Sequence, residues 1–166
     1  TLKVTFKDCI LYALSIGASV QNPSDIKYLY ENDEKFSAFP TMAIIPGQMA
    51  LSTSSIMENV IPGRSIDLTQ ILHGEQYLEI FRPMPTEGHL NNVFRIIDVL
   101  DKGSNAVILI GVDTFDENGH RICFGQTSIV VVGAGGFGGK RKTDKNIDID
   151  NPPNREPDAS EQQQTS

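Results

Sequence analysis

The sequence contains no tryptophan, and only two of its 166 residues are cysteine. Cys9 and Cys123 each stand alone in an apolar pattern, so we expect two buried free thiols, as in a reducing compartment. Lone cysteines do not form a metal site, which needs clustered ligands. No apolar run is long enough to cross a bilayer. The sequence therefore predicts neither a metal centre nor a membrane span.

Positive charge is also scarce, with 14 Lys and Arg against 21 Asp and Glu and a net charge of -7. Nucleic acids and anionic membranes repel such a chain, so we expect no nucleic-acid partner. The length suits one domain with its own core. We expect this domain over residues 1–139 and a linker over residues 140–166, which lack a periodic apolar face. Both ends resemble cuts within a longer chain.

Apolar periodicity predicts helices first and strands later. A helix is expected over residues 6–17, a short strand or extended segment over 26–30, and a short or broken helix within 39–56, where Pro46 and Gly47 interrupt the pattern. The later runs predict strands, which we place at residues 66–68, 76–81, 90–100, 106–116 and 121–132. Asn118-Gly119 predicts a tight hairpin, so the last three strands form an antiparallel meander.

This element order indicates an α+β fold, with an antiparallel sheet built after the helices. A hotdog fold, in which the sheet wraps around a helix, fits the pattern, here with an incomplete central helix. A roll, or a split sandwich with one helix, fits nearly as well.

The glycine-rich segment, residues 133–139, contains the pattern G-x-G-x-x-G after a strand. A dinucleotide site needs an apolar helix directly after this pattern, and the residues that follow have no apolar face. We therefore interpret the segment as a flexible exit from the last strand, followed by solvated lysines.

Residues 72–78 read LHGEQYL, a polar interruption in a strand-like run. His73 and Glu75 are two residues apart and would share one face of a regular strand, which suits acid–base chemistry. The alternative is structural, because glycine at position 74 is typical of a bulge or of close backbone approach.

The motif at 72–78 also resembles, together with others in the same order, the amino-terminal half of peroxisomal 2-enoyl-CoA hydratase 2, the hydratase region of multifunctional enzyme type 2 (MaoC-like). The other matching segments are YAL at 12–14, FPT at 39–41, VLDKGS at 99–104 and GAGGFGGKR at 133–141. The resemblance implies two hotdog repeats, of which this chain is the first. It also implies that His73, Gly74 and Lys102 contact the acyl-CoA substrate, with no cofactor.

The family's catalytic Asp and His lie in a Gly-Asp-x-Asn-Pro-x-His motif of the second repeat, and this sequence lacks that motif. The resemblance therefore implies no catalytic residue in this chain. It implies the acyl-CoA-binding half of a lyase that hydrates trans-2-enoyl-CoA reversibly to (3R)-3-hydroxyacyl-CoA in peroxisomal fatty-acid β-oxidation. The expected partners are the enoyl-CoA substrate and a second hotdog repeat, in a dimer.

Two other functions remain open at this stage. One is a non-catalytic hotdog module for acyl-CoA binding or assembly. The other is a CoA thioesterase, for which Glu75 or Asp98 would have to be the acid or nucleophile. In the hydratase interpretation, Pro46, Gly47 and the small residues at 52–55 predict a loose segment that leaves room for bulky acyl tails.

Overall fold

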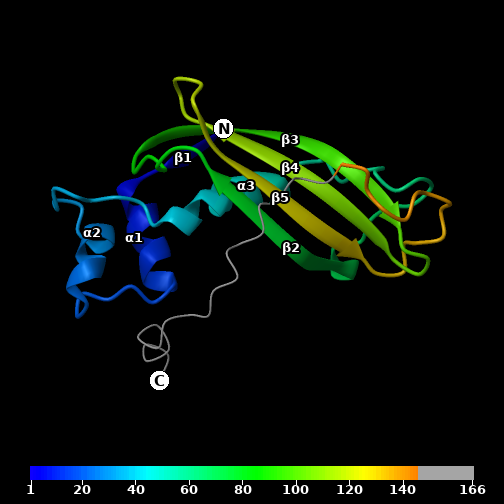
Figure 1. Ribbon diagram of the computed structural model, residues 1–166, viewed down its shortest axis with the longest axis horizontal. Helices are drawn as coiled ribbons and strands as arrows, with labels where there is room; N and C mark the ends of the chain where they lie inside the picture. The colour runs from blue at the N-terminus through cyan, green and yellow to red at the C-terminus, as the bar shows by residue number, and fades with distance from the viewer. Residues whose placement is uncertain (146–166) are drawn as a thin grey trace.

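A curved, five-stranded antiparallel sheet dominates the computed structural model, which describes residues 1–145 (Figure 1). Its strands lie in the order β1-β3-β4-β5-β2. The strands are β1 (Leu2–Val4), β2 (Ile71–Ile80), β3 (Gly88–Asp101), β4 (Ala106–Phe115) and β5 (Arg121–Val131). The two edges are therefore formed by β1, with the adjoining free part of β3, and by β2.

Short helices precede the sheet in the chain. They are α1 (Phe6–Ser15), η1 (Pro23–Asp25), α2 (Ile26–Leu29), η2 (Pro40–Ile44), α3 (Ile45–Ser52) and η3 (Leu68–Gln70). Figure 1 shows α1 and α2 at one end of the sheet and α3 behind it. The turn after β3 and the glycine-rich segment after β5 lie at the opposite end. The architecture is the expected hotdog arrangement, with a central helix of only eight residues.

The central helix α3 lies close to the inner face of the sheet. A Cβ atom at Gly47 would stand 3.2 Å from Val112 Cγ1 of β4, so any larger residue would have to push the Val112 side chain aside. Gln48 Nε2 donates to Gln76 Oε1 at 2.8 Å and to Thr127 Oγ1 at 3.1 Å. The hydroxyl of Thr127 also donates to Gln76 Oε1, at 2.9 Å. These bonds satisfy polar groups that would be costly to bury alone.

This packing corrects one expectation about residues 45–52. Proline at position 46 fits the first turn of α3, where its missing N–H has no intrahelical partner to lose. The interrupted helix over 39–56 is confirmed as η2 followed by α3. The prediction of a loose segment at Pro46 and Gly47 is wrong, because both residues are buried and Gly47 is in contact with the sheet.

Buried apolar residues form two clusters. One lies under α1, β1 and η2 and includes Val4, Cys9, Met42, Leu90 and Cys123. The other lies between α3 and the sheet and includes Ile61, Ile108, Ile110, Ile129 and Val131. Both cysteines are buried free thiols, as predicted. Burial raises the pKa of the Cys9 thiol to about 11, which makes this group a poor nucleophile at neutral pH.

Several other predictions agree with the structure. The helix expected over 6–17 is α1, and the carboxylate of Asp8 accepts the Thr5 N–H at 2.8 Å at its start. The meander of the last three strands is confirmed as β3, β4 and β5. The hairpin between β4 and β5 is confirmed as well, with Gly119 at a φ of +80°.

Two strand predictions are wrong. Residues 26–29 form α2, because Asn22 caps the preceding turn through Ser24 N and Pro23 begins it. Residues 66–68 form no strand, since the Asp67 carboxylate accepts the Thr69 N–H at 2.9 Å and closes a local turn that leads into η3. In addition, β1 was not expected, and β2 begins five residues earlier than residue 76, at Ile71.

None of the helices within residues 1–145 has the length and apolar composition that crossing a bilayer requires. The expected linker begins inside this range. Its first part contacts β3, since Lys140 O accepts the Asp101 N–H at 2.8 Å and Lys145 Nζ donates to Ile97 O at 2.8 Å. The rest of the expected linker lies outside the described residues, so the boundary after residue 139 stays a prediction.

We expect Gly47→Leu to destabilise the domain by about 1–3 kcal/mol, because the added side chain overpacks the contact with Val112. Urea unfolding of the variant and the unmodified chain measures this difference. Met49→Leu is the matched control, since Met49 lies two residues further along α3 and is 51% exposed. Equal unfolding midpoints for Gly47→Leu and the control would show that α3 does not pack tightly on β4.

Candidate functional site

The outer face of the sheet, opposite α3, carries a hollow of about 520 Å³. Its floor is formed by β4 and β5 and its sides by β2, the start of the β3–β4 turn and the segment after β5. The lining residues are Gly74, Glu75, Leu100, Lys102, Val107, Leu109, Gln126, Ser128, Val130, Thr143 and Lys145. Two of the three predicted substrate contacts, Gly74 and Lys102, therefore line one hollow although they are far apart in the chain.

A bulge at Gly74 shapes the β2 side of this hollow. The register of β2 on β5 shifts between His73, which pairs with Ile129, and Glu75, which pairs with Ser128. A Cβ atom at Gly74 would stand 3.1 Å from Ser128 O, so the backbones approach as closely as glycine allows. The structural interpretation of this glycine is confirmed.

The same bulge separates His73 from Glu75. Their partners on β5 are consecutive residues, whose side chains point to opposite faces of the sheet. His73 thus lies on the inner side of β2 with Ile129, whereas Glu75 lines the outer hollow. The expectation that His73 and Glu75 share a face is wrong, and the two do not form an acid–base pair.

Lys102 stands at the start of the turn between β3 and β4. Its backbone N–H donates to Asn105 O at 2.9 Å, and its Nζ donates to Arg141 O at 2.6 Å. The ammonium group is therefore held at the rim of the hollow by the segment that follows β5. Two further donor positions of the ammonium remain for a ligand.

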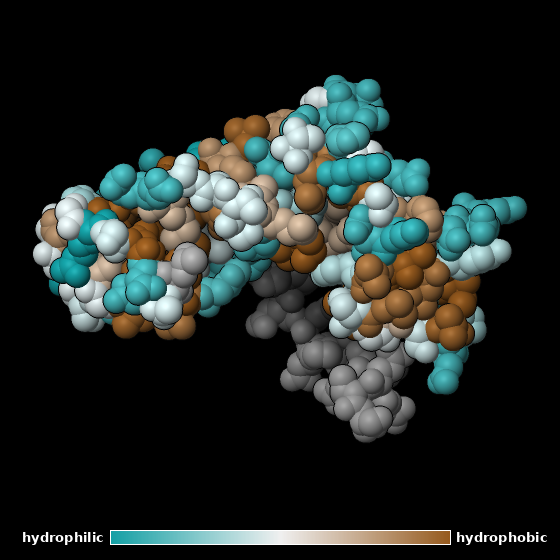
Figure 2. Space-filling view, turned by 180° about the vertical axis from the view of Figure 1, so that it is seen from behind, coloured by the Kyte–Doolittle hydropathy of each residue, from teal (hydrophilic) through white to brown (hydrophobic). Residues whose placement is uncertain are grey.

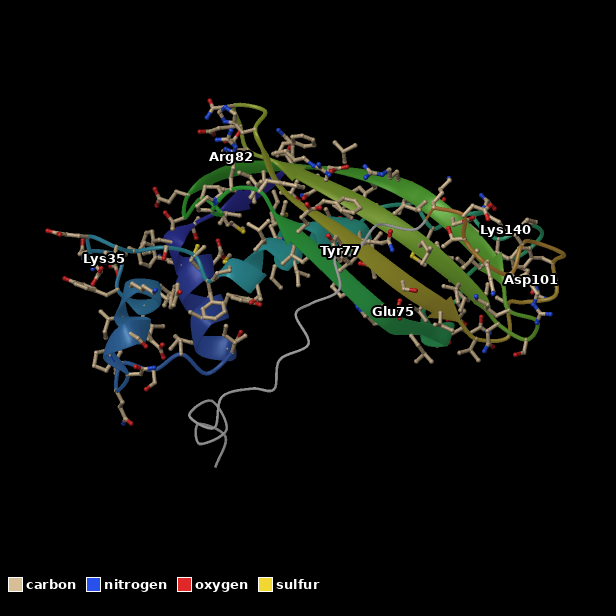
Figure 3. The ribbon with its side chains drawn as sticks, viewed as in Figure 1. Lys35, Glu75, Tyr77, Arg82, Asp101 and Lys140 are labelled. Carbon is tan, nitrogen blue, oxygen red and sulfur yellow. The ribbon has the colours of Figure 1, made fainter. Side chains whose placement is uncertain are left out.

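The carboxylate of Asp101 joins this turn to the glycine-rich segment. Its Oδ1 accepts N–H groups of Gly103 at 2.8 Å and Gly136 at 2.9 Å, and its Oδ2 accepts the Gly138 N–H at 2.8 Å. Hydrogen bonds from Gly136 and Gly103 lower the pKa of this carboxyl to about 2. Figure 3 shows Asp101 at the end of the sheet where Lys140 also lies.

These contacts explain the pattern G-x-G-x-x-G in structural terms. Successive backbone N–H groups form a concave anion site, as they do in phosphate-binding loops. Here Asp101 occupies that site, so the amides of Gly136 and Gly138 are already bonded. The segment is no solvated exit either, because Arg64 donates to Gly133 O at 2.8 Å and to Gly135 O at 3.3 Å.

Asp98, a candidate acid in the thioesterase interpretation, is buried beside Lys140. Burial would raise the pKa of its carboxyl, but hydrogen bonds from Lys140 and Thr143 bring that pKa below the usual range. Lys140 Nζ lies 2.8 Å from Asp98 Oδ2, and this pairing raises the pKa of Lys140. A carboxylate held ionised in this way is poorly suited to act as a general acid.

A second, apolar groove of about 330 Å³ lies at the helical end, between β1, α1 and α3. Leu11, Met42, Ile45 and Met49 are among its lining residues. Figure 2 shows hydrophobic surface gathered over this end of the molecule. Leu51, by contrast, packs into the cluster between α3 and the sheet.

The sequence alone did not indicate a role for Asp101. A local signal existed, since Asp-x-Gly in a turn is typical of a side chain that accepts a backbone N–H two residues on. Its contacts with Gly136 and Gly138 join positions 35 and 37 residues apart and left no local pattern. Within residues 1–145, no group of three or more His, Cys, Asp or Glu side chains is arranged to hold a metal ion.

Comparison with known proteins assigns the chain to a family. Residues 2–133 match the model of the MFE-2 hydratase 2 N-terminal domain. The chain belongs to this family. Over 162 residues the chain is 44% identical to peroxisomal multifunctional enzyme type 2 of Drosophila melanogaster, and this match covers 96% of the chain and 27% of that protein. It is 37% identical to a probable enoyl-CoA hydratase 2 of Dictyostelium discoideum, covering 98% of this chain and 54% of that protein.

Solved structures agree with this assignment. This chain aligns with full-length peroxisomal multifunctional enzyme type 2 from Drosophila melanogaster at a TM-score of 0.73 and 38% identity, over 95% of this chain and 26% of that one. A MaoC-like dehydratase from Phytophthora capsici aligns at 0.67 and 31% identity, over 94% of this chain and 52% of that one. The chain thus spans about a quarter to a half of the length of these relatives.

We expect Asp101→Asn to destabilise the domain at neutral pH and to change how its stability depends on pH. The lowered pKa means that the carboxylate contributes stability above its unfolded pKa, near 4, and that this contribution is lost as the pH falls toward about 2. The difference in unfolding free energy between the two proteins should therefore shrink over that range. Denaturant unfolding between pH 7 and pH 2 measures it.

Asp33→Asn serves as the control for this measurement. Asp33 Oδ1 accepts the Lys35 N–H at 2.7 Å within a local surface turn. A difference for Asp101→Asn that does not vary with pH would contradict the role of the ionised carboxylate.

Proposed function

We propose that this chain is the acyl-CoA-binding half of an R-specific 2-enoyl-CoA hydratase. The observation that carries the proposal is the meeting of Gly74 and Lys102, both matched to substrate-contacting positions of the family, in one hollow. The ammonium of Lys102 suits a CoA phosphate, and the backbone at Gly74 allows close approach of a ligand. Membership of the hydratase 2 N-terminal family supports the same reaction class.

His73, Gly74 and Lys102 suggest a path for the substrate. Lys102 lies at the rim of the outer hollow, Gly74 at its β2 side, and His73 on the inner side of β2. A CoA ester that runs from Lys102 past Gly74 would cross the β2 edge at the bulge and reach the His73 side chain. The imidazole can then hydrogen-bond the substrate on the inner side of the sheet, the side on which α3 and the apolar groove lie.

A second hotdog repeat would complete the enzyme beyond that edge. Among the described residues, β2 pairs with β5 alone, so the other edge of β2 presents unpaired backbone groups. Leu72 is 57% exposed and Ile80 is 41% exposed along this strand. A partner strand would cover both the backbone and these apolar side chains, and we propose a dimer of hotdog units on this basis.

The reaction requires water to add to C3 of the enoyl group and a proton to add to C2. In the proposed assembly the second repeat supplies the general base and the proton donor, since this sequence lacks the Gly-Asp-x-Asn-Pro-x-His motif. This chain binds the CoA moiety and fixes the orientation of the thioester, which lowers the entropic cost of the reaction. Relatives named as peroxisomal enzymes support a peroxisomal location for it.

The alternative is a non-catalytic hotdog module that binds acyl-CoA or assists assembly. The missing motif favours that function for this chain taken alone. For a thioesterase, the ion pair with Lys140 keeps Asp98 ionised and disfavours it as the acid, which leaves Glu75 in the outer hollow as the candidate.

We expect this chain to hydrate a trans-2-enoyl-CoA only when it is mixed with a separately produced carboxy-terminal hydratase repeat. Loss of the enoyl absorbance measures the reaction. A second repeat whose motif Asp is replaced by Asn is the control, and it should give no activity with this chain. Activity of the chain alone would overturn the assignment of catalysis to the second repeat. An inactive mixture of two folded and associated halves would favour the non-catalytic module.

The apolar groove beside α3 is proposed to receive the acyl tail. We expect Met49→Trp to lower kcat/KM for long enoyl-CoA substrates roughly tenfold more than for short ones, because the indole fills part of the groove. Steady-state kinetics of the mixture with C4 and C14 substrates measure this. Leu14→Trp is the control, since Leu14 is 51% exposed on α1 and is not part of the groove lining. Equal losses for both lengths would refute the acyl site.

A further inference from the structure

We infer that Asp101 is a positioning residue for CoA recognition, acting through Lys102. This inference rests on the proposed function, which gives Lys102 its ligand. Asp101 joins the β3–β4 turn, which carries Lys102, to the glycine-rich segment after β5. Asp101 itself does not line the hollow and does not contact the proposed ligand.

Asp101 helps to fix the backbone around Lys102. Asp101 Oδ1 accepts the Gly103 N–H at 2.8 Å, and the Lys102 N–H donates to Asn105 O at 2.9 Å. These bonds close the β3–β4 turn on both sides of Lys102. The direction in which the lysine side chain leaves the sheet is therefore set by the carboxylate of its neighbour.

Asp101 also supports the acceptor that holds the ammonium group of Lys102. Lys102 Nζ donates to Arg141 O at 2.6 Å, so its position depends on the segment after β5. Asp101 fixes that segment at three points, through the N–H groups of Gly136 and Gly138 and through its own N–H, which donates to Lys140 O. One residue thus holds both the base of the Lys102 side chain and the acceptor at its tip.

The β3–β4 turn and the glycine-rich segment after β5 pack tightly against each other. A Cβ atom at Gly135 would clash with the backbone of Gly103 and Asn105, so the two loops touch through main-chain atoms. The Gly133 N–H also donates to Asn105 Oδ1, at 3.0 Å. A rigid support of this kind keeps a charged side chain extended toward its ligand and reduces the entropy lost on binding.

Positive charge is concentrated around Lys102. The chain carries a net charge of -7, yet six of its basic residues are in or beside these loops, namely Arg64, Lys102, Lys140, Arg141, Lys142 and Lys145. Two carboxylates at this end are engaged, because Asp101 is bonded to backbone amides and Asp98 is paired with Lys140. Burying Asp101 among amides therefore keeps the carboxylate next to Lys102 in the chain from competing with a phosphate.

The inference is tested by kinetics of the mixture of this chain with the second repeat. The substrates are a trans-2-enoyl-CoA and the corresponding enoyl-pantetheine thioester, which lacks the nucleotide and its phosphates. We expect Asp101→Asn to raise KM for the CoA ester about tenfold, with kcat and the kinetics of the pantetheine ester nearly unchanged. A residue that only stabilises the fold would alter both substrates equally.

Two further variants sharpen the test. Lys102→Ala should raise KM for the CoA ester in the same selective way, and adding Asp101→Asn to it should produce no further increase. Asp116→Asn, in the matched turn at the other end of β4, should leave both substrates unaffected. Additive effects of Lys102→Ala and Asp101→Asn on KM would overturn the inference while leaving the proposed hydratase function intact.

A third variant and a direct binding measurement cover the case in which Asp101→Asn does not fold. Asn105→Ala removes the bond to Gly133 N without altering Asp101, and it should raise KM for the CoA ester alone by a smaller factor. Calorimetry with CoA and with pantetheine tests the same contact without turnover. Unmodified chain that binds CoA no more tightly than pantetheine would overturn both the inference and the CoA contact of Lys102.

Discussion

The carboxylate of Asp101 is the contact on which the arrangement of the functional end of the sheet depends. It accepts N–H groups from Gly103 in its own turn and from Gly136 and Gly138 in the segment after β5. Backbone amides that converge on one point need a negative charge between them, and a buried carboxylate needs donors. Each loop thus satisfies a requirement of the other, and neither arrangement is favourable alone.

The inner face of the sheet depends on a different constraint, the distance between α3 and β4. Glycine at position 47 removes the side chain that would hold the two apart, and Gln48 bonds to Gln76 and Thr127 where the helix meets the sheet. The short helix is therefore well packed although it is incomplete. On the other side of α3, toward α1 and β1, an apolar groove of about 330 Å³ remains.

The long strands of the meander were predictable because apolar periodicity and the Asn118-Gly119 turn are local signals. The error at residues 26–30 arose because five residues with loose alternation carry little information, and the cap at Asn22 starts a helical turn that leads into α2. The pairing of Asp101 with Gly136 could not be predicted, since nothing in a G-x-G-x-x-G pattern specifies which anion its amides bind. The resemblance to the hydratase family supplied Lys102, and only the fold placed Lys102 in one hollow with Gly74.

The bulge at Gly74 relates the outer hollow and the inner face of the sheet to the proposed reaction. In a regular strand, His73 and Glu75 would have shared a face, and the substrate would have met a polar pair on one side of the sheet. The extra residue instead turns His73 inward and leaves Glu75 outward, so the edge of β2 presents different groups to its two sides. A ligand with a charged nucleotide and an apolar acyl chain has the same asymmetry. Binding across a sheet edge, with the phosphates near Lys102 and the acyl chain beyond His73, suits such a ligand better than binding on either face alone.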